Sequence, residues 1–208
     1  MERDVFLARV RERLAGVDDV PMPVELPPTF ASGDGRLADR FAEELTKVGG
    51  EVRRVHTYEV ADTVAELADG CRTAVVAPGV GTLLARIEEG LRRVGCELAD
   101  ADRESAAAAD LGITGAELGV ASTGSVVVRM GPSAPRVASL LPPLHVCLLD
   151  EDRIVAGFEE LFAELPRHAA EASQTVLITG PSRTSDIERT LVWGVNGPIR
   201  LVVVIVAT

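Results

Sequence analysis

Apolar residues along this chain recur either at helical spacing or in short runs typical of buried strands. The helical spacing predicts helices over residues 2–16, 35–49, 60–68, 83–94 and 154–165. The apolar runs predict strands over residues 51–58, 73–77, 96–99, 126–128, 146–149, 176–179 and 201–206. Because strands alternate with helices, we expect a three-layer α/β fold around a mainly parallel sheet, with helices on both faces.

A proline-rich segment separates the first predicted helix from the rest of the chain. Pro21, Pro23, Pro27 and Pro28 favour an extended linker. We therefore divide the chain into an N-terminal helical arm with its linker, residues 1–28, and an α/β domain, residues 29–208. The arm helix packs either on its own domain or on a partner subunit, and the sequence leaves both open. The partner could be a second copy of this chain in a homo-oligomer.

Charge and composition exclude several classes of function. The net charge of −11 argues against a nucleic-acid partner, which would favour a basic surface. Lys47 is the only lysine, and because no G-K-[ST] motif exists the chain has no P-loop. No apolar segment follows Met1, and the run 201–206 is too short to cross a bilayer, so we expect a cytoplasmic protein with no membrane partner.

The residues that usually hold metals are scattered. The three cysteines, Cys71, Cys96 and Cys147, are far apart, whereas an iron–sulfur cluster needs grouped thiolates. There is also no H-x-x-H motif, so we predict no metal site and no cofactor bound by this chain. His145 follows two prolines at the start of a predicted strand, and we expect it to be a hydrogen-bonded structural histidine.

A first candidate site lies in the loop after the strand predicted at 176–179. Ser182, Arg183 and Thr184 would present two hydroxyls, one guanidinium and free backbone N–H groups at one point. Such a point suits a carboxylate or a phosphate. Alternatively, the hydroxyls only cap a following helix while Arg183 lies on the surface. That helix is predicted to begin near Asp186, because Ser185 and Glu188 have capping-box spacing.

A second candidate site precedes the strand predicted at 126–128. Thr123, Gly124 and Ser125 form a turn of small residues, and glycine there allows close approach of a ligand or of another backbone. Glu117 is flanked by apolar and small residues, which makes it the candidate catalytic acid, base or nucleophile. The alternative is an ordinary polar position in a loop.

Together these segments resemble a known family, the LUD domain family, and more narrowly its lactate-utilisation branch. Five segments occur in the family's order and spacing and cover about half of the chain: Ile113–Glu117, Ala121–Val126, Ser139–His145, Gly180–Glu188 and Gly194–Pro198. The resemblance implies an α/β fold similar to that of sugar-phosphate isomerases and CoA transferases (the NagB/RpiA/CoA-transferase-like fold). It also implies a non-redox subunit of a three-part system that oxidises L-lactate to pyruvate, with iron–sulfur clusters on the partner proteins. The family pattern supplies no residue-level mechanism.

We therefore expect a small-anion pocket at the carboxyl ends of the parallel strands. Arg183, Ser182 and Thr184 would form one wall, and residues 123–125 the opposite wall, with Glu117 nearby. A second hypothesis is a free-standing isomerase, transferase or ligase acting on a phosphorylated or CoA-linked substrate through Glu117. A third is an assembly scaffold, in which both loops only pack against neighbouring elements.

Overall fold

A computed structural model describes residues 3–15, 36–77, 79–130, 136–165, 174–184 and 192–207. Its centre is a sheet of six strands in the order β1-β12-β7-β4-β2-β3, in which every neighbouring pair is parallel. The strands are β1 (Glu51–His56), β2 (Thr73–Val76), β3 (Glu97–Ala99), β4 (Leu111–Gly115), β7 (Leu144–Asp150) and β12 (Arg200–Ala207). The apolar run of β12 is buried from Leu201 to Val206, as expected for a central parallel strand covered on both faces.

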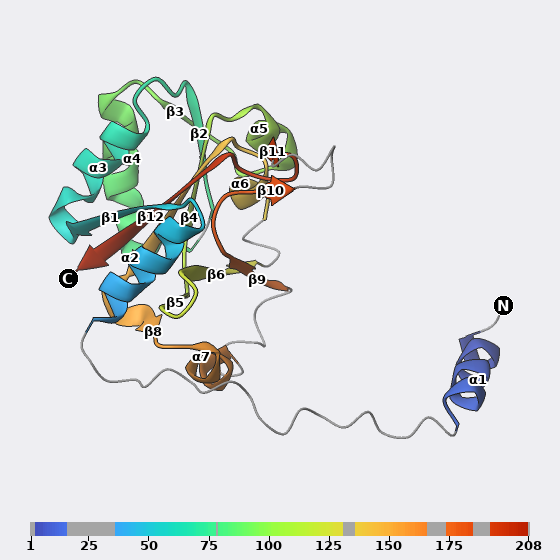
Figure 1. Ribbon diagram of the computed structural model, residues 1–208. Helices are drawn as coiled ribbons and strands as arrows, with labels where there is room; N and C mark the ends of the chain where they lie inside the picture. The colour runs from blue at the N-terminus through green and yellow to red at the C-terminus, as the bar shows by residue number, and fades with distance from the viewer. Residues whose placement is uncertain are drawn as a thin grey trace.

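Two helices cover one face of the central sheet (Figure 1). They are α3 (Val60–Leu67) and α4 (Leu84–Arg93), preceded by the short 3-10 turns η1 (Thr57–Glu59) and η2 (Gly81–Leu83). Val64 of α3 and Ile87 of α4 are buried in one apolar cluster with Val202 and Val204 of β12. Two of the predicted helices are therefore confirmed, and their apolar stripes are the faces that contact the sheet.

The opposite face is covered by α2 (Leu37–Lys47), by a second sheet, and by the short helices α5 (Arg103–Ala108) and α6 (Val137–Leu140). The second sheet has the order β8-β5-β6-β9. Its strands are β5 (Leu118–Val120), β6 (Ser125–Met130), β8 (Ile154–Val155) and β9 (Gln174–Ile178). Phe41 and Leu45 of α2 pack with Val126 and Val128 of β6 above the central sheet, and α7 (Phe158–Glu164) buries Leu161 on the outer face.

The helix predicted over residues 154–165 is wrong at its start. Ile154 and Val155 form β8, which pairs in parallel with β5 after the 3-10 turn η3 (Glu151–Arg153). The helix α7 begins only after Gly157, whose backbone N–H donates a hydrogen bond to Glu160 Oε2 at 3.0 Å. Two β-branched residues next to a free strand edge therefore join the sheet, although their spacing also fitted a helix.

The C-terminal motif forms a short hairpin of β10 (Arg183–Thr184) and β11 (Val192–Trp193). The helix predicted near Asp186 lies outside the described residues, as does the predicted domain boundary at residue 28. The first predicted helix is present as α1 (Arg3–Leu14) and lies apart from the α/β domain (Figure 1). Within the described parts of the chain, no helix is long and apolar enough to span a membrane.

Candidate functional site

Three hydroxyl groups form a chain at the meeting point of β6 and β9. Thr123 Oγ1 lies 2.7 Å from Ser125 Oγ, and Ser125 Oγ lies 2.6 Å from Thr179 Oγ1. The register of the two strands, with Val126 opposite Ile178, places Ser125 beside Thr179. Ser125 is only 1% exposed, whereas Thr179 reaches the surface. The predicted Thr123–Ser125 turn therefore lies next to Thr179, the residue that precedes the Gly180–Thr184 loop.

The end of α2 packs against both of these segments. A Cβ at Gly124 would lie 2.2 Å from the backbone nitrogen of Leu45, and a Cβ at Gly180 would lie 2.8 Å from the carbonyl oxygen of Val48. Both glycines also have positive φ angles, +64° and +83°. The sequence predicted that Gly124 allows close approach of either a ligand or another backbone. In the structure another backbone, that of α2, lies against it.

Ser182 ties its loop to the turn that follows β11. Its backbone N–H donates to the carbonyl oxygen of Pro198 at 3.0 Å, and its own carbonyl accepts from the N–H of Gly194 at 2.9 Å. Its hydroxyl oxygen accepts from the N–H of Asn196 at 3.3 Å. Because two backbone groups and the hydroxyl all serve this turn, Ser182 acts in the structure as an anchor between the two family segments.

Arg183 lies on the surface above an aromatic ring. Its guanidinium carbon is 5.5 Å from the centre of the Trp193 ring, and Trp193 itself packs on Gly49, where a Cβ would lie 2.9 Å from the ring. Among the described residues no carboxylate forms an ion pair with Arg183. A guanidinium above an aromatic ring gains a cation–π attraction and still carries N–H donors that can bind an anion. Thr184 lies beside it in β10, opposite Val192.

These loops lie at the amino ends of the parallel strands, and the predicted position at the carboxyl ends is wrong. Trp193 contacts Gly49, which precedes β1, and the N–H groups of Ile199 and Arg200 both donate to the carbonyl oxygen of Pro143, which precedes β7. The reason is that the strand before Gly180 is β9, which pairs in antiparallel fashion with β6 in the second sheet. The rule for parallel sheets therefore does not apply to it.

Glu117 is not part of the hydroxyl chain formed by Thr123, Ser125 and Thr179. Its carboxylate oxygen Oε2 lies 2.7 Å from Nε of Arg129, and the Glu117 side chain is 10% exposed. Arg129 and Ser125 are four residues apart in β6, which corresponds to about 13 Å along a strand. The predicted neighbourhood of Glu117 and the hydroxyl turn is therefore absent, and the structure pairs Glu117 with a cation at the other end of the β5–β6 hairpin.

His145 lies in the sheet interior. Its Nε2 atom is 2.9 Å from Thr114 Oγ1, and the Thr114 hydroxyl also lies 3.5 Å from the sulfur of Cys147. Burial lowers the pKa of His145 to about 4 and raises the pKa of the Cys147 thiol to about 12. A neutral, hydrogen-bonded imidazole in this position is the structural histidine that the sequence predicted. Within the described residues, no three His, Cys, Asp or Glu side chains are grouped as metal ligands.

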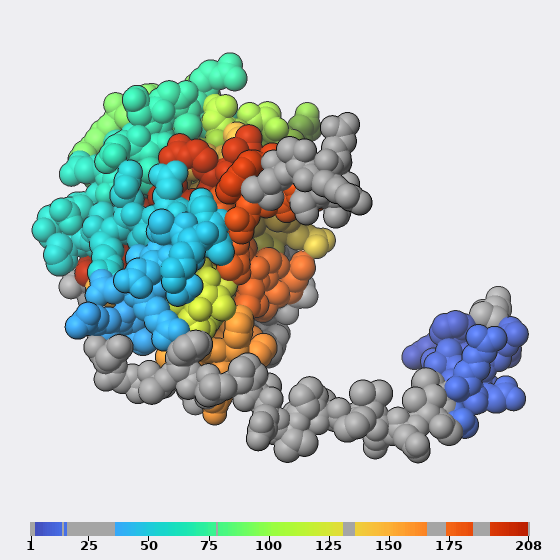
Figure 2. Space-filling view, viewed as in Figure 1, coloured from blue at the N-terminus to red at the C-terminus, as the bar shows by residue number. Residues whose placement is uncertain are grey.

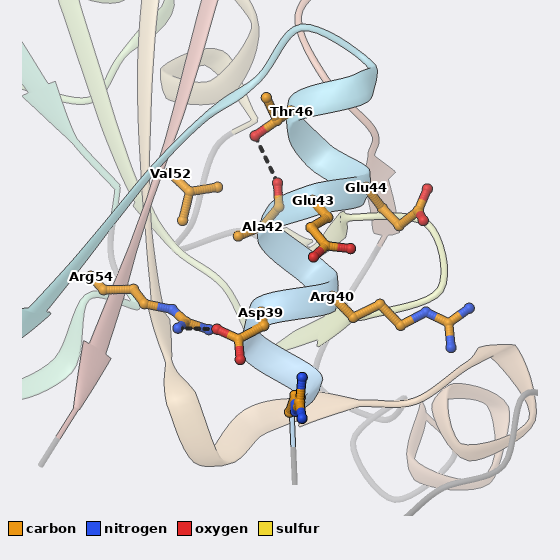
Figure 3. A pocket seen from close by; sticks show the side chains of 9 residues that line it. Asp39, Arg40, Ala42, Glu43, Glu44, Thr46, Val52 and Arg54 are labelled. Atoms are coloured by element: carbon orange, nitrogen blue, oxygen red, sulfur yellow. Dashed lines mark hydrogen bonds and ion pairs between the residues drawn. The ribbon is translucent and has the colours of Figure 1, made fainter. Parts of the chain in front are cut away.

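A polar groove of about 880 Å³ runs along the outer side of α2 and the edge strand β1 (Figure 3). Arginines and acidic residues both line it, and Arg54 forms an ion pair with Asp39 across it. None of the predicted site residues lies in this groove. Its mixed charge gives no preference for an anion, so we do not place the site there.

Two residues that contact the predicted site residues were not themselves predicted. They are Thr179, at the end of the hydroxyl chain, and Trp193, under Arg183. The pairing register of β9 with β6 places Thr179 beside Ser125, and the β10–β11 hairpin places Trp193 opposite Arg183. Thr179 is the last residue of a predicted strand, which is the one signal in the sequence that could have marked it. No local signal indicates that Trp193 lies under Arg183.

Comparisons with known proteins place the chain in a family. Residues 38–206 match the family model described as the LUD domain. Lactate utilization protein C of Anoxybacillus flavithermus is 28% identical over 219 residues, covering 98% of each chain. The protein of that name from Deinococcus radiodurans is 27% identical over 187 residues, covering 89% of this chain and 85% of that one. An uncharacterised Neisseria meningitidis protein is 38% identical over 95 residues, which is 45% of this chain and 41% of that protein.

A solved structure agrees with the fold. The crystal structure of a DUF162 family protein from Deinococcus radiodurans is similar with a TM-score of 0.61 at 20% identity, covering 82% of this chain and 96% of that chain. At this identity the likeness concerns the fold alone, and it agrees with the α/β architecture described above. Because the family model extends from α2 to the end of β12, this chain belongs to the LUD domain family.

Proposed function

We propose that this protein is a non-redox component of a lactate-utilisation system that oxidises L-lactate to pyruvate. The observation that carries the proposal is the full-length similarity to a Lactate utilization protein C, which covers 98% of both chains. Partial similarity would fit a shared module in an unrelated system, whereas similarity from end to end favours a shared role. The iron–sulfur proteins of such a system are the expected partners, and their cofactors would move the electrons.

In this proposal the chain binds a small anion, such as the carboxylate of lactate or pyruvate, at the amino edge of the sheet. Arg183 supplies the cation; its guanidinium lies above the Trp193 ring, and its N–H donors can form a bidentate contact with a carboxylate. The exposed end of the Thr123–Ser125–Thr179 hydroxyl chain supplies further donors. Ser182 acts indirectly in this proposal, because its hydrogen bonds hold the turn that follows β11 in place.

Replacing Arg183 with alanine tests the site. The charge-assisted hydrogen bonds would be lost, so binding of lactate or pyruvate to the purified protein should weaken by roughly 10- to 100-fold, or about 1.5–3 kcal/mol. Isothermal titration calorimetry measures this directly. Arg103→Ala removes an exposed arginine of α5 and is the matched control. Unchanged anion affinity in Arg183→Ala would overturn the site assignment.

The non-redox part of the proposal has its own test. The purified chain should show no iron–sulfur or flavin absorbance and no stoichiometric iron, because its three cysteines are far apart in the sequence. Absorption spectroscopy and iron analysis measure this. A brown preparation with stoichiometric iron would contradict it.

A second candidate, the assembly scaffold, is favoured by the hydrogen bonds of Ser182, whose polar groups all serve the adjoining turn. Under that hypothesis, Arg183→Ala leaves lactate-dependent growth intact while deletion of the protein abolishes complex assembly. The free-standing enzyme has less support, because its candidate residue Glu117 is paired with Arg129 and lies away from the hydroxyl chain.

A further inference from the structure

The helix α1 carries three exposed apolar side chains. Val5 is 52% exposed, Phe6 50% and Val10 36%. Phe6 and Val10 are four residues apart and line a shallow groove of about 270 Å³ together with Arg9 and Arg13. Figure 2 shows α1 as a separate body beside the α/β domain. A single helix with such a face gains stability by packing this face against another apolar surface.

The helix α7 has an exposed face of the same kind. Its inner residue Leu161 is fully buried, but Phe158 is 40% exposed and Phe162 62% exposed. The two phenylalanine rings stack on each other with 6.1 Å between their centres. They are four residues apart, as Phe6 and Val10 are, so each helix presents one row of two large apolar side chains.

The charges of the two helices are complementary. The sequence of α1 contains four arginines and two acidic residues, whereas α7 contains three glutamates and no basic residue. Opposite charges around matching apolar rows favour a helix-to-helix contact and specify its partner. From this we propose that α1 of one molecule packs on the Phe158–Phe162 face of α7 in a second molecule.

The connection between α1 and the domain is long enough for α1 to reach a second molecule. Residues 16–35 include four prolines, a composition that favours an extended spacer, and twenty residues can reach roughly 70 Å. In a dimer with two-fold symmetry each molecule gives its α1 and receives the other's, so the same contact forms twice. The dimer is thus stabilised by exchange of the N-terminal arms.

Sedimentation equilibrium of the full chain tests the proposal. The wild-type protein should be a dimer, and Phe6→Asp and Phe162→Asp should each give a monomer, because each places a carboxylate in both apolar contacts. Leu98→Asp, an exposed apolar position on the edge strand β3, is the matched control and should remain dimeric. Circular dichroism checks that each variant keeps its fold. A wild-type monomer, or a dimer unaffected by both substitutions, would overturn the proposal.

Mixing the two monomeric variants distinguishes exchange of α1 between two molecules from packing of α1 on its own domain. The intact α1 of Phe162→Asp can bind the intact α7 of Phe6→Asp, so an equimolar mixture should recover a dimer with one of its two contacts. If α1 instead packs on its own domain, mixing restores nothing. Recovery of the mixed dimer would support arm exchange, and its absence would contradict it.

Discussion

Replacing Gly124 with alanine is expected to lower the free energy of unfolding by about 3–4 kcal/mol, among the largest effects of any single methyl group in this protein. The new Cβ would lie 2.2 Å from the nitrogen and 2.6 Å from the Cα of Leu45, both in the backbone of α2. Neither atom can rotate away, so the helix end must shift. The positive φ of +64° adds backbone strain for any residue with a side chain.

Gly95→Ala is the matched control for this prediction. Gly95 has a φ of +70°, close to that of Gly124, but its Cβ would meet no atom within 4 Å. Its cost should therefore be only the conformational term, about 1 kcal/mol. Urea denaturation of the two variants measures both values. Equal losses in the two variants would show that the close contact between Gly124 and α2 contributes nothing.

A second large effect should come from His145 when the pH falls. Burial lowers its pKa in the folded state to about 4, whereas an unfolded chain has the ordinary value near 6.5. Between pH 6.5 and pH 4, His145 is therefore mostly protonated in the unfolded state and mostly neutral in the folded state. The stability contributed by the neutral imidazole is present above pH 6.5 and is lost as the pH falls towards 4, by about 3 kcal/mol in all.

The measurement compares unfolding free energies of the wild-type protein and His145→Gln at pH 7.5 and pH 4. Glutamine can still bond to Thr114 but does not titrate, so the wild-type protein should lose about 3 kcal/mol more than the variant over this range. Carboxylates that titrate in both proteins cancel in the comparison. Parallel losses in the two proteins would contradict the assignment of a buried, neutral His145.

The sequence predicted the elements whose apolar pattern is strong. The stripe of Leu37, Phe41 and Leu45 marked α2, and the unbroken apolar run of β12 marked a strand buried on both faces. The parallel α/β class followed from the alternation of such elements. These features depend on the periodicity of single elements, which a sequence displays directly.

The strand β4 and the second sheet could not be recognised in the same way. Gly112 and Gly115 interrupt the apolar pattern of β4 because other backbones lie against them: a Cβ would approach Ala138 O to 1.8 Å and Gly79 O to 2.4 Å. Such contacts join residues far apart in the chain and leave no periodic mark. The strand β8 is too short for its alternation to be read, and only its pairing with β5 defines it.

The arrangement of the candidate site also depends on strand pairing. The hydrogen bond between Ser125 and Thr179 joins the 123–125 turn to the residue before the Gly180–Thr184 loop, through the pairing of β6 with β9. Their place at the amino edge of the central sheet could not be predicted, because it follows from the membership of β9 in the antiparallel sheet. The separation of Glu117 from Ser125 also follows from strand pairing and not from local sequence.

The most direct test of the proposed function is isolation of the tagged protein from its native host grown on lactate, followed by an assay of electron transfer from lactate to an acceptor. The proposal predicts that iron–sulfur proteins co-purify with it and that activity requires every component. Arg183→Ala should then reduce the activity of the assembled system. A protein that purifies alone, and whose removal leaves lactate oxidation unchanged, would contradict a role in lactate utilisation.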